Sequence, residues 1–240
     1  MHYAELADAH CHLDLFENPE KVIMDSVADG VKVMITAGGS DKSNQATLKL
    51  TGNQHVFGVV GIDPSFVASD SRHIGELERL LKSSKHIVGI GEVGLDVKVT
   101  SASHDMQKKA FAEQISIAKS LDVPVVIHSR GMIKEVIEIV REEKLERAMF
   151  HFFEGNAEQA AELAKRGFMI SIPPVGLDRR KRIINVVDEH NIVAESDSPA
   201  AGKTPAEILN VISMVAEVKG LDLSDAAFSL TENVKKFFYI

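Results

Sequence analysis

The sequence has 240 residues, 45% of them hydrophobic, and a formal net charge of −8, so it can bury a large core and lacks the basic surface of proteins that neutralise many phosphates. Its single cysteine, Cys11, excludes an internal disulfide and suits a reducing cytoplasm. The first residues do not resemble a signal peptide and no apolar run could cross a bilayer, so we expect a cytoplasmic protein without a membrane partner.

Apolar runs rich in β-branched residues alternate with segments of helical periodicity along the chain. Eight runs are predicted strands: Glu5–Ala9, Val31–Ala37, Val56–Ile62, Ile87–Gly91, Val123–His128, Ala148–Phe152, Phe168–Ile172 and Ile192–Glu195. Between them, apolar residues three and four positions apart predict helices that pack one face on a sheet. Asn18-Pro19 and Thr204-Pro205 are typical helix starts. Gly30 and Gly220 are typical helix ends.

Eight strands alternating with helices predict an α/β fold, a (β/α)8 TIM barrel, as one domain over residues 1–240. The run Pro124-Val125-Val126-Ile127 is apolar throughout, as in a parallel strand buried on both faces. The alternative is an open, doubly wound sheet. It is disfavoured because no Gly-x-Gly-x-x-Gly follows the first strand.

Reactive side chains cluster where the predicted strands end, which in a TIM barrel is the mouth that carries active sites. They are His10 and His12 after strand one, Glu92 and Asp96 after strand four, His128 at the end of strand five, His151 at the end of strand six, and Glu195 and Asp197 where strand eight ends. His10 and His12 are two residues apart, so on a strand they point the same way, whereas Cys11 faces the helices as a packing residue. The other six histidines are expected at the surface: His2, His55, His73, His86, His104 and His190.

Four imidazoles and two carboxylates exceed the three protein ligands of a catalytic zinc ion, and therefore predict two divalent cations. Glu92 is the natural bridge, because each of its oxygens can take one ion. Asp197 would bind one ion and take the proton from the attacking water, which makes Glu92 and Asp197 the predicted catalytic carboxylates. The ligand set suits Zn, Mn, Fe or Ni, whereas Mg prefers more oxygen ligands.

Five motifs in this order resemble the TatD family of metal-dependent hydrolases, barrels of the amidohydrolase superfamily usually described as deoxyribonucleases. They are Asp8-x-His10-x-His12, Gly91-Glu92-x-Gly94-Leu95-Asp96, Pro124-x-x-Ile127-His128-Ser129-Arg130, His151-x-Phe153-x-Gly155 and Glu195-x-Asp197-Ser198-Pro199. The resemblance implies that His10, His12, Glu92 and Asp197 hold one metal and that Glu92, His128 and His151 hold the second. It implies hydrolysis of a phosphodiester, with single-stranded DNA as the nucleic-acid substrate.

The sequence departs from the family where the substrate would be contacted. After strand three the family usually has Gly-x-His-Pro-His, whereas this chain has Asp63 and Ser65 at the histidine positions. Val97 replaces an aromatic residue, and the loop after Pro199 is short. The metal chemistry therefore carries over better than the specificity for nucleic acid.

Cations that could replace these contacts include Arg130, Lys98, Lys203 and the run Arg179-Arg180-Lys181-Arg182. Arg130 is the predicted substrate-binding residue, because its planar fork matches phosphate oxygens and it follows His128 by two positions. The run is interpreted as a solvated helix face.

Two other functions stay open. One is a dinuclear hydrolase of a small anionic ester, lactone or amide, or of a small phosphoester, which Asp63, Ser65 and the short loop favour. The other is a metal-binding scaffold without activity, which six intact ligands argue against. No stable protein partner is predicted.

Overall fold

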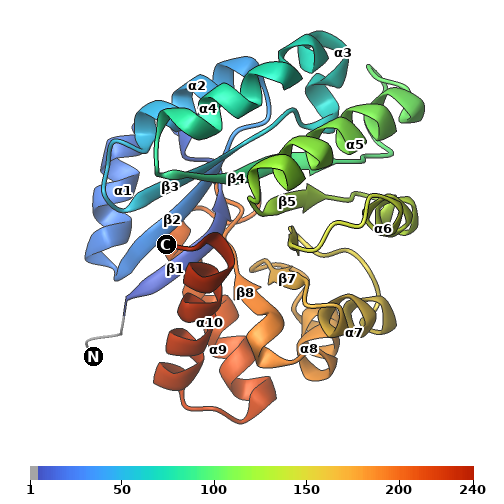
Figure 1. The fold of residues 1–240 in the computed structure, drawn as a ribbon. Helices are drawn as coiled ribbons and strands as arrows, with labels where there is room; N and C mark the ends of the chain where they lie inside the picture. Colours follow the sequence, from blue (N-terminus) through green and yellow to red (C-terminus); the bar gives the residue numbers. More distant parts are fainter. Residues whose placement is uncertain (1–4) are drawn as a thin grey trace. The chain divides into compact units, whose positions relative to one another are not determined.

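A computed structural model describes residues 5–240, apart from the side chain of Leu177. Eight strands alternate with helices, in the element order predicted for a TIM barrel (Figure 1). None of the helices within residues 5–240 combines the length and the hydropathy needed to cross a bilayer. The chain divides into two compact units, one made of residues up to Thr36 together with Gly155–Ile240 and the other of Ala37–Glu154. The single domain over residues 1–240 stays a prediction.

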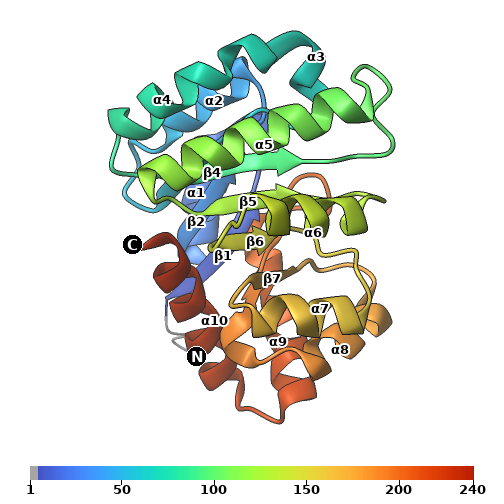
Figure 2. The same cartoon turned by 45° about the vertical axis from the view of Figure 1, so that its right-hand side comes forward.

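The first unit combines the two ends of the chain. Its strands are β1 (Leu6–Cys11), β2 (Val31–Ala37, which ends at the unit boundary), β7 (Met169–Ile172) and β8 (Ile192–Ala194). β1 pairs with β2, and β7 with β8, in parallel. Its helices are α1 (Pro19–Ala28), α7 (Ala157–Lys165), α8 (Leu177–Val186), α9 (Ile208–Lys219) and α10 (Leu223–Phe238). Figures 1 and 2 show α9 and α10 side by side, and α10 packs on β1 and β8.

The second unit is one continuous segment. Its strands β3 (Val56–Val60), β4 (Ile87–Gly94), β5 (Val125–His128) and β6 (Ala148–Phe150) pair in parallel in this order. Its helices are α2 (Asp41–Leu50), α3 (Val67–Asp70), α4 (Leu77–Ser83), α5 (His104–Leu121) and α6 (Ile133–Glu142). Figure 2 shows α4 and α5 running along β4, which both helices contact. The strands are buried along nearly their whole length, as expected for parallel strands covered by helices.

The predicted helix boundaries follow local capping chemistry. Asn18 caps α1 by accepting from the Lys21 N–H, and Pro19 occupies the first helical position. Thr204-Pro205 instead opens a short 3-10 helix, and α9 begins after it, at Ile208. Gly220 ends α9 with φ +66°, a left-handed conformation that favours glycine.

Helix α5 fixes the chain segments that follow β3 and β4 through two buried glutamines. The Gln114 side chain accepts from the Ile62 N–H at 2.7 Å and donates to the Ile62 carbonyl at 3.1 Å. The Gln107 side chain accepts from the Asp96 N–H at 2.9 Å and donates to the Asp96 carbonyl at 3.2 Å. Each glutamine side chain thus supplies the acceptor and the donor that a neighbouring strand would otherwise supply. The buried backbone N–H and carbonyl groups at these positions are therefore satisfied.

Candidate functional site

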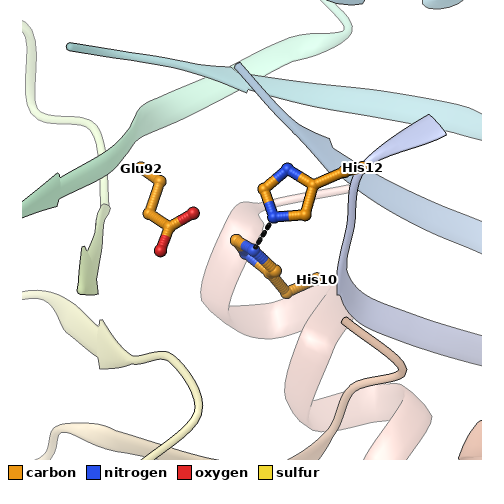
Figure 3. A group of neighbouring side chains, drawn as sticks. All are labelled: His10, His12 and Glu92. Atoms are coloured by element: carbon orange, nitrogen blue, oxygen red, sulfur yellow. Dashed lines mark hydrogen bonds between the residues drawn. The ribbon is translucent and has the colours of Figure 1, made fainter. Parts of the chain in front are cut away.

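His10, His12 and Asp197 form one group of possible metal ligands, in the first unit. The His10 and His12 Nε2 atoms lie 3.2 Å apart (dashed line in Figure 3). Oδ1 of Asp197 lies 3.4 Å from His12 Nε2 and 3.9 Å from His10 Nε2. The His10 side chain is fully buried, and His12 and Asp197 expose only 18% and 10% of theirs. The fold of the first unit therefore brings together three of the six predicted metal ligands.

The backbone holds this group in place. β1 continues to Cys11, beyond the predicted end at Ala9, so His10 lies inside the strand, and the register with β2 shifts between Asp8 and Cys11. The Asp197 N–H donates to the His10 carbonyl at 2.9 Å, which ties the segment after β8 to β1. Asp197 has φ +46°, a conformation rare outside glycine that persists where the surroundings enforce it.

Asp8 links β1 to the segment after β8 without belonging to the ligand group. Its carboxyl accepts from the Ser196 hydroxyl at 2.5 Å, the Ser196 N–H at 2.8 Å and the His10 N–H at 3.3 Å. Burial raises the pKa of Asp8 to about 8, although the hydrogen bonds from Ser196 lower it. The role of Ser196 was missed from sequence; the available signal was a charged residue, Asp8, inside an otherwise apolar strand.

Glu92, His128 and His151 form a second group of possible ligands, in the second unit, with one atom of each within 4.8 Å of the others. Oε1 of Glu92 lies 2.6 Å from His128 Nδ1 and 3.5 Å from His151 Nε2. β4 runs to Gly94 rather than to the predicted end at Gly91, which places Glu92 inside the strand. The two imidazole rings stack with their centroids 6.3 Å apart.

Two carboxylates surround His128 and favour its charged form. Burial lowers the pKa of His128, but the hydrogen bonds with Asp96 and Glu92 outweigh it and raise that pKa well above its usual value. Oδ2 of Asp96 lies 3.1 Å from His128 Nε2. Burial raises the pKa of Asp96, yet the hydrogen bonds from His128 and the Lys98 N–H leave it lowered. The sequence predicts Asp96 at a strand end but does not indicate this role.

Arg130, the predicted substrate residue, lies beside this second group. Its Nη1 is 3.4 Å from Asp96 Oδ2, and 56% of its side chain is exposed. Asp63, the acidic replacement after β3, accepts from the Ser65 N–H at 2.8 Å and so caps a 3-10 helix. Burial, followed by the charge of Glu92, raises the pKa of Asp63. This carboxyl thus has a local backbone role in the second unit.

The remaining predictions concern Cys11 and the histidines outside the two ligand groups. Cys11 is fully buried and its thiol donates to the Ile35 carbonyl, as a packing residue would. His104 and His190 are exposed as expected. His55, His73 and His86 are half-buried, so each also reaches the surface in part. His2 lies outside the described residues.

The donor chemistry of both groups fits divalent cations. Each group offers three protein ligands, the number that catalytic zinc sites use. In the first group two imidazole nitrogens lie 3.2 Å apart, an arrangement that a shared proton or a cation stabilises. In the second group a glutamate lies beside two imidazoles. Imidazole and carboxylate ligands suit Zn, Mn, Fe and Ni.

Comparison with known proteins gives a consistent result. Residues 7–239 match the protein family described as TatD related DNase. An uncharacterized metal-dependent hydrolase of Methanocaldococcus jannaschii is 28% identical, over 99% of this chain and 98% of its own. The human protein named deoxyribonuclease TATDN3 is 28% identical, over 97% of this chain and 94% of its own.

Solved structures confirm the fold class. The TatD homologue YJJV of Escherichia coli has a TM-score of 0.90 at 21% identity, with 98% of both chains covered. The phosphotriesterase homology protein of Escherichia coli, solved with phosphate in its active site, has a TM-score of 0.69 at 16% identity over 99% of both chains. The TIM-barrel prediction is therefore confirmed over the open, doubly wound alternative.

Proposed function

Because the chain belongs to the TatD related DNase family of metal-dependent hydrolases, we propose that it hydrolyses phosphodiester bonds in single-stranded DNA with two bound divalent cations. The observation that carries the proposal is the division of the six predicted ligands into two groups of three, each within one compact unit. The groups are His10, His12 and Asp197, and Glu92, His128 and His151.

We assign each group one cation, which when bound would lower the pKa of a water molecule and withdraw charge from a phosphoryl oxygen. Asp197 accepts the proton of the attacking water, a role that its carboxylate supports. Asp96 positions His128 through the 3.1 Å contact with Nε2. The sharing of Glu92 between both cations stays a prediction, as does the choice among Zn, Mn, Fe, Ni and Mg.

Arg130 is proposed to bind a phosphate of the substrate. Its side chain is more than half exposed, so it can reach a ligand, while the contact with Asp96 restrains one end of the guanidinium. A planar fork of donors matches two phosphate oxygens. The name of the human relative supports a nucleic-acid substrate, and the structural neighbour with phosphate in its active site supports phosphoryl chemistry.

The test is cleavage of end-labelled single-stranded DNA, with RNA of the same sequence, in the presence of each candidate metal. We expect DNA cleavage that Asp197→Asn reduces by about 10²–10⁴-fold, the usual contribution of a general base. Asp122→Asn is the matched control, because Asp122 is an exposed carboxylate paired with Arg147 and should leave the rate unchanged. Failure of every metal to support cleavage would overturn the proposal.

A second candidate is hydrolysis of a small anionic ester, lactone or amide. Asp63 and Ser65 replace two histidines usual in the family, and the net charge of −8 repels a long polyanion. A substrate panel measured with the same protein decides between the two. A kcat/KM for DNA far above that of every small ester would exclude this candidate.

A further inference from the structure

A pocket of about 520 Å³ lies in the first unit between the start of α7 and helix α8. Arg179 and Arg182 border it from α8, and Gly155, Asn156 and Glu158 from the start of α7. None of these residues belongs to either ligand group. We propose that this pocket binds a phosphate group through the guanidiniums of Arg179 and Arg182.

The arginine run divides into two pairs with different roles. Arg180 is buried, with only 3% exposed, and donates to the Val175 carbonyl at 3.2 Å. Lys181 pairs with Glu217 at 2.7 Å. The interpretation of the whole run as a solvated helix face is therefore wrong for Arg180, because a helix directs successive side chains to different sides. Arg179 and Arg182 are the exposed pair that borders the pocket.

The two guanidiniums are suited to one anion. They are three positions apart on α8, so they lie on the same face and repel each other when no anion is between them. Arg179 donates one N–H to the Gly155 carbonyl at 3.0 Å, which orients its fork at the rim of the pocket. Among residues 5–240, no ion pair is made by Arg182. Its donors are therefore available to a ligand.

The remaining wall restricts the charge of the ligand. Glu158 is exposed at the pocket, so these three side chains carry a net charge of +1. That charge matches a phosphodiester, with one negative charge, better than a dianion. The Asn156–Gln159 capping box already uses the Asn156 and Gln159 N–H groups, so the charged donors at the pocket are the two guanidiniums.

The pocket lies on the reactive side of its unit. β7 and β8 are parallel; α8 follows β7, and Asp197 follows β8. Under the proposed function, the phosphate that this pocket binds would belong to the backbone of a DNA strand. This reading rests on the proposed function, whereas a free phosphorylated metabolite would supply the same chemistry without it.

The experiment titrates inorganic phosphate, and separately an oligothymidylate, into the metal-loaded full chain while the Gly155 and Ala157 amide resonances are followed by NMR. We expect saturable shifts. The double variant Arg179→Ala/Arg182→Ala should raise the dissociation constant at least about tenfold, as lost charged hydrogen bonds do. Arg79→Ala is the matched control: it removes an exposed guanidinium from the second unit and should change the constant less than twofold.

Tighter binding of the oligothymidylate than of phosphate would identify nucleic acid as the source, and binding of phosphate alone a small phosphorylated ligand; both support the pocket. No saturable shift with either probe, or an unchanged constant in a double variant that melts like wild type, would overturn it. DNA cleavage without these shifts refutes only the pocket. Shifts without DNA cleavage refute only the proposed function.

Discussion

At the scale of single residues, carboxylates contact both ring nitrogens of His128. Glu92 lies 2.6 Å from Nδ1 and Asp96 lies 3.1 Å from Nε2. Only Glu92 also approaches His151, at 3.5 Å. Asp96 instead approaches Arg130, so it connects the second ligand group to the predicted phosphate-binding residue. Substitution of Asp96 therefore tests positioning without removing a predicted ligand.

Asp96→Asn keeps the size of the side chain and removes the charge that orients His128. Groups that orient a metal ligand typically contribute 10–100-fold in metal affinity or activity. We expect metal affinity to fall by about 10–100-fold, measured by competition with a chelating dye, with the fold unchanged by circular dichroism. Asp122→Asn should bind metal like wild type. Equal affinities in Asp96→Asn and wild type would contradict the positioning role.

Cys11 separates His10 from His12 in the sequence but is fully buried beside β2, and burial raises the pKa of its thiol. We expect the native protein not to react with a thiol reagent such as DTNB, and the urea-unfolded protein to react fully. Cys11→Ala should keep its bound metal and at least about half of its activity, because it loses only packing contacts. Loss of metal in this variant would instead make Cys11 a ligand.

At this scale the candidate ligands can be predicted from the sequence, whereas the residues that support them cannot. His128 and His151 stand out because they lie at the ends of otherwise apolar predicted strands, where the other predicted ligands also gather. Asp96 and Ser196 acquire their roles from contacts with residues 32 and 188 positions away, which no local pattern encodes. Asp63 shows the converse: its departure from the family motif was visible, but its capping role depends on the local backbone.

At the scale of elements, Gly94 of β4 lies directly beside His128 of β5. Gly94 has φ +144° and pairs in register with His128. A Cβ on Gly94 would overlap the His128 carbonyl oxygen. The absence of a side chain at Gly94 therefore allows β5 to present His128 to Glu92.

Gly94→Ala should force these strands apart and destabilise the protein by about 3 kcal/mol, since overpacking and a disfavoured φ act together. The measurement is the free energy of unfolding in urea. Gly75→Ala is the matched control, because no atom lies within 4 Å of the added Cβ, and it should change that free energy by less than about 0.5 kcal/mol. A loss below about 1 kcal/mol in Gly94→Ala would contradict the steric argument.

Strand number and order were predictable because the alternation of apolar runs and helices is a local signal. The ends of the strands were less predictable from the sequence. β1 and β4 both extend past their predicted ends, and the pairing of each shifts register near a predicted ligand. Such irregularities depend on the neighbouring strand and commonly lie next to functional sites. The glutamines of α5 are likewise invisible in a periodicity that treats polar residues as surface.

At the scale of the whole molecule, metal binding should appear as stability. A ligand that binds only the folded state at 100 times its dissociation constant adds about 2.7 kcal/mol. Two such cations should raise the Tm of a chain of this size by roughly 10–20 °C. Differential scanning fluorimetry with and without a chelator measures the difference, and an unchanged Tm would contradict both sites.

Single substitutions measure how much of the Tm increase each ligand group contributes. His12→Ala should lose the part contributed by the first group and keep the part contributed by the second, and His128→Ala the reverse. Glu92→Gln decides whether one carboxylate serves both cations. Loss of the entire shift would support sharing, whereas loss of the second group's part alone would confine Glu92 to that group.

The discontinuity of the first unit has a consequence for biosynthesis. Glu92, His128 and His151 have all been synthesised once residue 151 is added, but Asp197 is added 46 residues later and 187 residues after His10. At about 5–20 residues per second, Asp197 is added roughly 10–40 s after His10 but only about 2–9 s after His151. During translation the second group therefore becomes available to metal first, and the first group can be completed only when most of the chain exists.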